Sequence, residues 1–262
     1  MREASSEGGG GDSVMVGSTD GVTGEPTLTV VVPAHNSGSA LAHSVRTLTT
    51  AWPDLSTEVV IVENGSTDDT LATARRLAAK HPDRVRVICS ETGLGRAYAA
   101  GIRAARGSTV LLTADDLPFG VSDVSSWTVA GGPGAEQVFI GSKAHPHSRV
   151  RRSLLRSLMT SVFSLERRVV LDMHIGDTQG TVFAPRPWLL AQLPHLKEGG
   201  YLFSTELLYA ATLQTVPVTE LPVELDLTTR RASTVSLRDA WQMFIGLLQL
   251  RRRRESLRAA SR

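Results

Sequence analysis

The sequence predicts an α/β fold with a mostly parallel central sheet flanked by helices. Short, continuous Val-rich runs recur between residues 28 and 113. Segments with helical spacing of apolar residues separate these runs, and a polar cluster follows most of them. A strand that is apolar at every position is typical of a sheet covered on both faces, as parallel sheets are.

The four predicted strands are residues 28–33, 58–62, 84–88 and 109–113. Each run has the length of a strand and lacks the alternation of a half-exposed one. Parallel sheets bind ligands outside the carboxyl ends of their strands. We therefore expect the functional residues in the clusters that follow the strands: His35-Asn36, Glu63-Asn64-Gly65-Ser66 and Asp115-Asp116.

Each segment between these strands has a helical signature. Residues 41–48 carry apolar side chains at helical spacing. Ser66 stands three residues before Asp69, which resembles a capping box and predicts that a helix starts there. Residues 96–106 are predicted to be helical, with Gly107 ending the helix. Strands that alternate with such helices form βαβ units.

The second half of the chain is less regular. Residues 137–141 favour a further strand, and residues 149–168 favour a basic helix with one apolar side. Residues 237–250 predict an amphipathic helix, followed directly by Arg251–Arg254. Such a helix suits packing against the domain, and it also suits the surface of an anionic membrane leaflet. Both interpretations stay open.

Three regions follow from this pattern. Residues 1–26 are rich in Gly, Ser and Thr and cannot bury enough surface to offset their ordering entropy, so we expect a disordered tail. Residues 27–240 form the predicted α/β domain, and residues 241–262 the basic C-terminal helix. No run reaches the roughly 18 apolar residues that a membrane-spanning helix needs.

Composition excludes several function classes. The 28 Lys and Arg nearly balance the 26 Asp and Glu, so a dedicated nucleic-acid binder is not expected. A single cysteine, Cys89, excludes a disulfide framework and a cysteine-based zinc cluster. The amino end has no secretory signal pattern, and we expect a cytoplasmic or cytoplasm-facing protein.

Four ordered segments carry a resemblance to a known family. They are VVVPAHN at 30–36, VVIVENGSTDDT at 59–70, ETGLGRAYAAGIRAARG at 91–107 and TADDLPF at 113–119. The second half adds GSK at 141–143, DTQG at 177–180, Glu206 and ELPVEL at 220–225. Their ordered combination resembles family 2 glycosyltransferases with the GT-A fold, and within that family the dolichol- or polyprenol-phosphate sugar synthases.

The resemblance implies an inverting transfer of a sugar from a GDP- or UDP-linked donor to polyprenyl phosphate. Such an acceptor implies work at the inner face of the cell membrane. The nucleotide-binding residues would be Pro33, Ala34, His35, Glu63, Asn64 and Gly65, with Arg96 and Arg231 on the diphosphate. Glu63 stands where the family usually has Asp. Turn and capping chemistry is the alternative role for Glu63 and Asn64.

The resemblance also implies a Mg²⁺ or Mn²⁺ site at an Asp-x-Asp motif, and two carboxylates after a buried strand suit such a cation. Here the motif is displaced. Aligning Leu117 with the family's Leu puts Asp116 at the second Asp and Ala114 at the first. Sliding by one puts Thr113 and Asp115 there. We therefore assign the metal to Asp116 and Asp115, in that order of preference.

The acceptor phosphate would need cations. Lys143, Arg149, Arg151 and Arg152 lie where the family places its acceptor-binding arginines, and we assign Arg149 and Arg152, with Asp115 and Asp116, to catalysis. A basic, solvated surface is the alternative. Further on, Arg230 or Arg231 would supply the family's diphosphate-clamping arginine, whereas Thr234 stands at its usual Lys.

Two rival functions stay open. A GT-A transferase with a hydroxyl acceptor, a glycan or metabolite, would need a general base, for which Asp177, His174 and Glu206 are candidates. Glu206 could equally be a paired, buried carboxylate. The displaced Asp motif and the missing Lys favour a third possibility, a catalytically degenerate protein that binds a nucleotide-sugar or a lipid phosphate.

Overall fold

The computed structural model describes residues 25–150, 154–225 and 237–259. Its described part contains one seven-stranded sheet in the order β3-β2-β1-β4-β6-β5-β7. The strands are β1 Leu28–Ala34, β2 Thr57–Glu63, β3 Val85–Cys89, β4 Thr109–Leu112, β5 Val138–Ser142, β6 Val182–Pro185 and β7 Val218–Pro222. β6 runs antiparallel to β4 and β5, and every other pair is parallel. The predicted fold class is confirmed.

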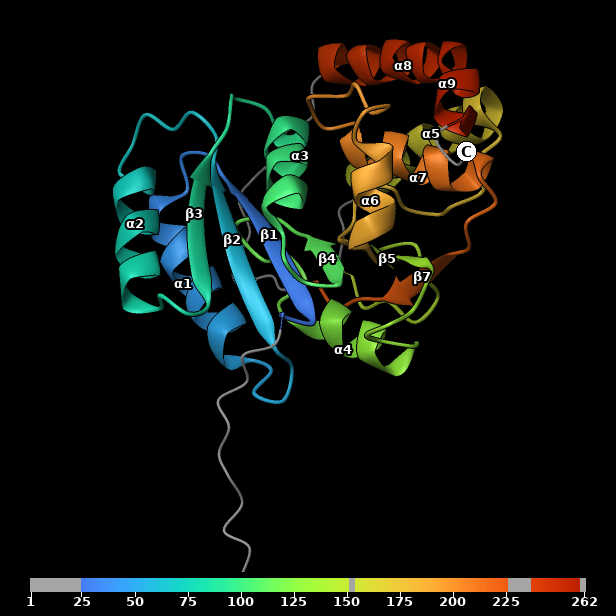
Figure 1. Cartoon of the computed structure of the whole chain (residues 1–262). Coiled ribbons are helices and arrows are strands. Elements are labelled where there is room, and N and C mark those ends of the chain that lie inside the picture. Colours follow the sequence, from blue (N-terminus) through green and yellow to red (C-terminus); the bar gives the residue numbers. More distant parts are fainter. Residues whose placement is uncertain (1–24, 151–153, 226–236, 260–262) are drawn as a thin grey trace, which may run out of the picture.

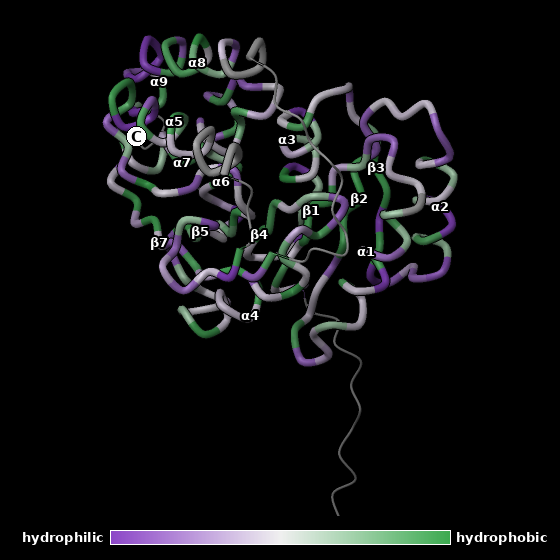
Figure 2. The backbone as a smooth tube through the Cα atoms, turned by 180° about the vertical axis from the view of Figure 1, so that it is seen from behind, coloured by the Kyte–Doolittle hydropathy of each residue, from purple (hydrophilic) through white to green (hydrophobic). Residues whose placement is uncertain are grey.

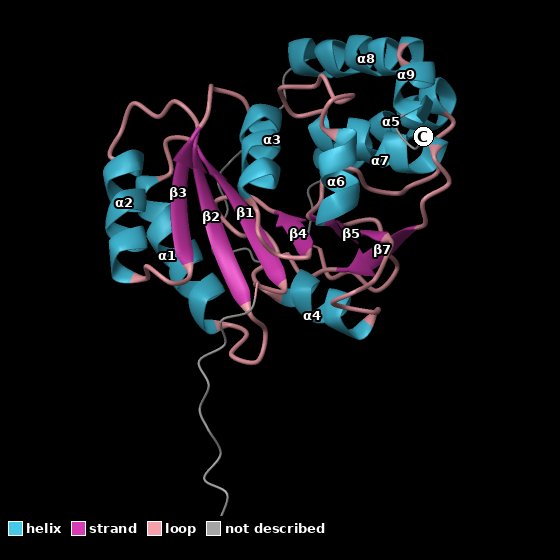
Figure 3. Cartoon of the chain, viewed as in Figure 1, coloured by secondary structure: helices cyan, strands magenta, loops and turns pink. Residues whose placement is uncertain are grey.

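Helices cover both faces of this sheet (Figures 1 and 3). They are α1 Gly38–Thr50, α2 Thr70–Lys80, α3 Leu94–Ala104, α4 Ser122–Val129, α5 Leu154–Leu171, α6 Arg186–Gln192, α7 Phe203–Leu213, α8 Leu237–Arg252 and α9 Arg254–Ala259. Figure 1 shows α8 and α9 lying together with α5, α6 and α7 on one side of the molecule, while α1 and α2 lie beside β2 and β3.

The alternation of side chains along β1 divides the core in two. Val30 and Val32 belong to one core cluster, with residues of α1, α2 and α4. Val31 belongs to the other, with residues of α3, α5, α6, α7, α8 and α9. All three valines have no exposed surface. Burial on both faces explains why this strand is continuously apolar. In Figure 2 the backbone tube is largely green, which marks hydrophobic residues, along the central strands.

The predicted capping box before α2 is wrong. The helix begins at Thr70 with Asp69 at its N-cap position, and the side chain of Asp69 does not cap it. Ser66 instead accepts a hydrogen bond from the backbone N–H of Asn36 at 3.1 Å. The physical reason is that Ser66 lies against the turn after β1 and bonds to it, whereas Asp68 Oδ1 accepts the N–H of Thr70 at the helix start at 3.0 Å.

The basic helix predicted for residues 149–168 begins later, at Leu154, and continues to Leu171. Arg149 lies outside it, in an isolated parallel bridge to Glu224. Its backbone N–H donates to Val223 O at 3.0 Å, and its carbonyl accepts from Leu225 N at 3.2 Å. These long-range backbone bonds hold Arg149 extended, which overrides the helical pattern of the sequence.

The C-terminal helices are part of the packed domain. Leu247, Leu250 and Leu257 have no exposed surface and belong to the same core cluster as α3 and α7. The apolar face of the predicted amphipathic helix is therefore used in the core, and α8 begins at Leu237, before residue 241. Within the described ranges, a helix both long and apolar enough to span a bilayer is not found.

Asp123 lies in the first turn of α4, next to Val124, which belongs to the same core cluster as Val30 and Val32. Asp123 is 3% exposed, and burial raises its pKa from the ordinary 3.8 to about 6. The folded state binds this proton more tightly than the unfolded state. Ionisation of Asp123 therefore lowers the free energy of unfolding as the pH rises from about 4, and the full cost is reached above about pH 6. This cost disappears as the pH falls below about 4.

Replacing Asp123 by asparagine should therefore stabilise the protein at pH 7, by at most about 3 kcal/mol. The amide oxygen can still accept the hydrogen bond that Val124 N–H gives to Asp123 Oδ1 at 2.8 Å. Urea unfolding at pH 7 and pH 5 measures this effect. The gain from Asp123→Asn should shrink at pH 5, and an equal gain at both values would contradict the argument.

Candidate active site

The turns that follow β1, β2 and β4 meet at one edge of the sheet. These strands are neighbours and parallel, so their carboxyl ends coincide. His35 Nδ1 lies 3.1 Å from Asn64 O, which joins the first turn to the second. Ser37 Oγ donates to Asp115 Oδ2, which joins the first turn to the third. The structure thus brings His35, Asn64 and Asp115 into one connected cluster.

Glu63 ends β2 within this cluster. It is 7% exposed, and its Oε1 accepts the N–H of Ser66 at 2.5 Å. The carboxylate therefore shapes its own turn, as the alternative role for Glu63 predicts. Among the described residues, no donor reaches the buried Oδ1 of Asn64. Buried polar atoms are normally satisfied, so this oxygen is suited to a donor from water or a ligand.

Gly65 brings the loop before α3 against the same turn. It has a φ of +82°, and a Cβ added there would overlap Thr92 Oγ1. Arg96 Nη1 in turn donates to Thr92 O at 2.8 Å, and its Nε lies 3.4 Å from Glu91 Oε2. The guanidinium is 56% exposed. Thr92 therefore lies between Arg96 and the turn at Gly65.

The start of α3 differs from an open anion-binding helix end. The backbone N–H of Gly95 donates to Gly199 O at 3.0 Å, and the N–H of Arg96 points to the same oxygen at 3.4 Å. A Cβ at Gly95 would overlap Glu198 O, so glycine permits this close approach. These N–H groups are occupied by the protein. The contribution that Arg96 can make to phosphate binding is that of its side chain.

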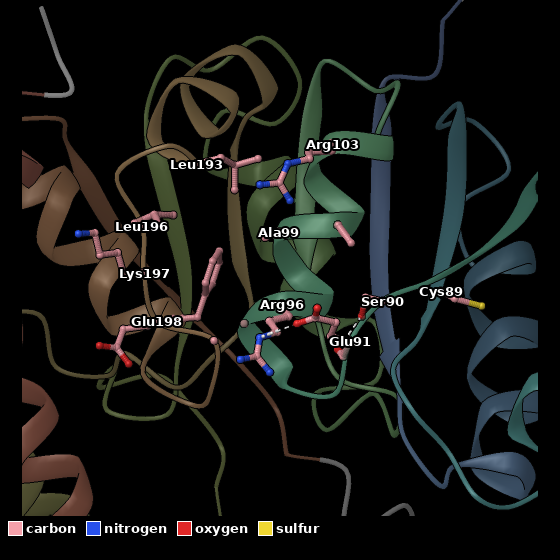
Figure 4. A pocket seen from close by; sticks show the side chains of 14 residues that line it. Cys89, Ser90, Glu91, Arg96, Ala99, Arg103, Leu193, Leu196, Lys197 and Glu198 are labelled. Carbon is pink, nitrogen blue, oxygen red and sulfur yellow. Dashed lines mark hydrogen bonds and ion pairs between the residues drawn. The ribbon is translucent and has the colours of Figure 1, made fainter.

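A cavity of about 430 Å³ lies beside Arg96, between α3 and the segment that precedes α7 (Figure 4). Cations, acids and apolar groups all line it, among them Arg96, Arg103, Lys197, Glu91, Glu198, Leu193, Leu196 and Phe203. Figure 4 shows Arg96 turned toward Glu91 on one wall, with Lys197 and Glu198 on the other. The cavity reaches the end of β2 through Cys89 and Ser90, since the N–H of Ser90 donates to Glu63 O at 2.8 Å.

Asp115 and Asp116 follow β4, and both are partly exposed. Asp115 is anchored twice, because its carboxylate accepts from Ser37 Oγ and its carbonyl accepts from Ser44 Oγ at 2.5 Å. Leu117 has a positive φ of 43° and is 4% exposed. Burial of this leucine holds an otherwise unfavourable backbone turn in place.

Tyr98 lies behind the two aspartates. Its hydroxyl donates to Thr113 O at 3.1 Å. Burial raises the pKa of Tyr98, and the negative charges of Asp115 and Asp116 raise it further. The phenol therefore stays neutral and supports the backbone of the acidic loop.

The donor chemistry of this loop fits a hard divalent cation. Mg²⁺ is commonly held by one or two carboxylates together with substrate phosphate oxygens, which suits the adjacent Asp115 and Asp116. The described ranges contain no cluster of three or more His, Cys, Asp or Glu side chains placed to hold a metal. The remaining ligands would therefore come from the diphosphate and water.

Lys143 follows β5 at the same edge. Its ammonium lies 2.9 Å from Asp177 Oδ2 and 5.3 Å from the ring centre of Phe119. Burial opposes ionisation of Asp177, but Lys143 and backbone N–H groups outweigh it and lower the pKa of Asp177. Gln179 donates from Nε2 to Thr205 Oγ1 at 3.2 Å. This network ties β5 to α7 and neutralises the charge of Lys143 internally.

Arg149 is placed differently. Its side chain is 84% exposed, and its Nη1 lies 3.4 Å from Glu224 Oε1, whose side chain is 63% exposed. Such a surface ion pair contributes little, so the guanidinium can exchange partners readily. Arg151, Arg152, Arg230, Arg231 and Thr234 lie outside the described residues.

Glu206 is a paired, buried carboxylate. It has no exposed surface and accepts hydrogen bonds from Lys197 N and Glu198 N at 3.0 and 2.8 Å. Arg253 Nη1 lies 2.6 Å from its Oε1. The same arginine reaches Glu198 at 3.1 Å. Glu206 therefore joins α7 to the C-terminal helices and the wall of the cavity beside Arg96.

Three residues of this site were not predicted from the sequence: Ser37, Ser44 and Tyr98. Ser37 directly follows His35-Asn36 at the carboxyl edge, and that position could have identified it. Ser44 and Tyr98 lie on helices, and their contacts with the acidic loop span 71 and 15 residues. No local signal reveals such contacts.

Replacing Gly65 by alanine should destabilise the protein by about 2 kcal/mol, because an L side chain strains the positive φ and also overlaps Thr92. Gly120→Ala is the matched control. Gly120 has a positive φ of 57°, but no atom lies within 4 Å of an added Cβ. Urea unfolding should show a smaller loss for Gly120→Ala. Equal losses would mean that the contact with Thr92 is unimportant.

The family 2 glycosyl transferase profile matches residues 29–119, which carry β1, β2, β3, β4 and the turns described above. Polyprenol monophosphomannose synthase of Mycolicibacterium smegmatis is 31% identical over 237 residues, covering 84% of this chain and 87% of that protein. Dolichyl-phosphate beta-glucosyltransferase of Homo sapiens is 28% identical over 219 residues. That match covers 75% of this chain and 66% of the human protein.

The solved structures agree on the fold. Glucosyl-3-phosphoglycerate synthase from Mycobacterium tuberculosis, in complex with Mn²⁺, UDP-glucose and glycerol 3-phosphate, superposes with a TM-score of 0.61 at 20% identity. The superposition covers 86% of this chain and 80% of that one. Sequence and fold together lead to one conclusion: this chain belongs to the family 2 glycosyltransferases and has the GT-A fold.

Proposed function

We propose that this enzyme transfers a sugar, with inversion, from a GDP- or UDP-linked donor to polyprenyl phosphate. The observation that carries the proposal is the similarity to a polyprenol monophosphomannose synthase over 84% of the chain. The connected cluster at the carboxyl edge of β1, β2 and β4 supports it, because ligands of such sheets bind there.

The donor nucleotide would lie against the turn after β1 and the end of β2. Pro33, Ala34 and His35 would border the base, and Glu63 would accept a hydrogen bond from a base N–H. The buried Oδ1 of Asn64 offers a second acceptor, since the described residues leave it without a donor. Gly65 keeps this turn close to Thr92 and so to Arg96, which would contact the diphosphate with Arg231.

The acidic loop would hold the metal and the leaving group. Asp116 and Asp115 are the ligands that we assign to Mg²⁺ or Mn²⁺. A bound divalent cation stabilises the negative charge that develops on the leaving diphosphate. Ser37 and Ser44 keep Asp115 in place, so the loop does not need to reorganise when the donor binds.

The acceptor phosphate would supply its own nucleophilic oxygen, which is ionised at neutral pH, so no strong general base is required. Arg149 and Arg152 would hold that phosphate. The exposed guanidinium of Arg149 and its weak partner Glu224 support this role. Lys143 is a poorer candidate, because Asp177 already neutralises it. A lipid acceptor would bring the enzyme into peripheral contact with the inner face of the cell membrane.

The rival with a hydroxyl acceptor needs a base near the sugar. Asp177 is bound to Lys143, and Glu206 is bound to Arg253 and two backbone N–H groups. His174 is 66% exposed and lies beside Asp172 and Arg168, at the end of α5. These contacts give each candidate a structural partner and favour the phosphate acceptor.

The test is incubation with a panel of radiolabelled GDP- and UDP-sugars, Mn²⁺ or Mg²⁺, and polyprenyl phosphate in membranes. Lipid-linked label with one donor is the expected result. Label on soluble glycans or metabolites alone would favour the hydroxyl acceptor. Calorimetric titration with a nucleoside diphosphate should show binding that strengthens with Mn²⁺. Binding that ignores metal, together with no turnover, would instead indicate a degenerate binding protein.

A further inference from the structure

A second cavity, of about 500 Å³, lies where α5, α7, α8 and α9 meet. We call it the arginine cavity. Its charged lining residues are Arg168, Arg251, Arg254, Arg258 and Asp172, and Tyr209 and Val169 also line it. None of the residues assigned to the sugar transfer belongs to it. Four arginines and one carboxylate, all of them exposed, thus line this cavity.

The lining of this cavity carries more positive than negative side chains. Within the described ranges, no ion pair joins Arg168, Arg251 or Arg254 to an acidic side chain. Asp172, the one acid in the lining, lies 3.5 Å from His174 Nε2. Like charges gathered on one surface repel each other, so an anion bound among these arginines would lower the electrostatic energy.

Helix ends explain only part of this arrangement. Arg168 and Arg251 lie in the last turns of α5 and α8, where cations interact favourably with the helix dipole. Arg251 also donates to Val170 O at 2.6 Å. Arg254, however, is the first residue of α9, where the helix dipole disfavours a cation. Its position therefore needs another reason.

Tyr209 supplies an independent observation. It is 2% exposed, yet it lines the cavity, and its hydroxyl forms no hydrogen bond within the described part of the chain. Burial raises the pKa of Tyr209, whereas the positive charges of Arg254 and Arg251 lower it. The hydroxyl is not among the buried polar atoms that lack a partner, so it is reached from the cavity and can donate to a ligand there.

We propose that the arginine cavity is a binding site for a phosphate group. Guanidinium groups match phosphate oxygens with paired N–H donors, and the Tyr209 hydroxyl would add one more. The phosphate could belong to a free anion or to the headgroup of an anionic lipid. This site shares no residue with the turns that follow β1, β2 and β4, so it does not depend on the proposed sugar transfer.

The test uses Val169→Glu, which places a carboxylate on the cavity lining at a residue 69% exposed. Val162→Glu is the matched control, because Val162 is also exposed, lies on α5, and does not line the cavity. Calorimetry with inorganic phosphate in EDTA measures the free anion. Co-sedimentation with vesicles of equal parts phosphatidylglycerol and phosphatidylcholine measures the headgroup.

Val169→Glu should weaken binding about tenfold or more, because it sets a like charge against the anion, and Val162→Glu should leave it unchanged. Loss in the phosphate titration assigns the site to a free anion, and loss only with vesicles assigns it to a headgroup. Arg254→Gln should reproduce the loss. If the wild type binds neither probe, or if both glutamate variants bind equally well, the proposal is overturned.

Discussion

Replacing Asp116 by asparagine should lower kcat for sugar transfer by roughly a hundredfold or more, with little change in stability. The carboxylate that we assign to the metal would be lost, and with it the charge stabilisation of the leaving diphosphate. Asp116 is partly exposed, so the asparagine amide of the variant would not be a buried polar group without a hydrogen-bond partner. The measurement is kcat with the donor that the wild type uses, over a range of Mn²⁺ concentrations.

Asp83→Asn is the matched control for this variant. Asp83 is an exposed aspartate in the turn before β3, away from the carboxyl edge, and its loss should leave kcat unchanged. Asp115→Asn should have an intermediate effect, because its amide oxygen can still accept from Ser37. Wild-type kcat in Asp116→Asn at every metal concentration would show that the displaced motif does not hold the catalytic metal.

Replacing Arg253 by methionine should destabilise the protein by about 3 kcal/mol. Glu206 has no exposed surface, and without the guanidinium 2.6 Å away it would remain as an uncompensated buried charge. Glu198 would lose its partner as well. The expected observation is a clearly lower midpoint of urea unfolding at neutral pH, with a single transition.

Arg252→Met tests whether this effect belongs to the pair. Arg252 is the exposed neighbour of Arg253 at the end of α8, so its replacement removes the same charge and adds the same side chain. Its unfolding midpoint should stay close to that of the wild type. Equal losses in the two variants would mean that the positive charge of this segment, rather than the contact with Glu206, stabilises the fold.

The first half of the chain was predictable because its signals are local. The runs that became β1, β2, β3 and β4 are apolar at consecutive positions, and the spacing between them has room for one helix each. Parallel neighbours then place the polar turns at one edge as a consequence of topology. The cluster of His35, Glu63 and Asp115 follows from this rule.

The second half was harder to predict because non-local contacts decide it. Arg149 follows a helical pattern in the sequence but is extended in the structure, because it pairs with Glu224, 75 residues later. The basic run Arg251–Arg254 resembles a membrane-binding segment. Its contacts within the domain, from Arg251 to Val170 O and from Arg253 to Glu206, could not be predicted from the sequence.

By itself, the sequence determined the order of the first strands and helices, the residues that follow each strand, and the family. Only the tertiary structure decided the roles of charged groups such as Glu206, Lys143 and Arg253. The reason is physical: apolar periodicity acts over a few neighbouring residues, whereas the partner of a buried charge is chosen by packing between distant segments.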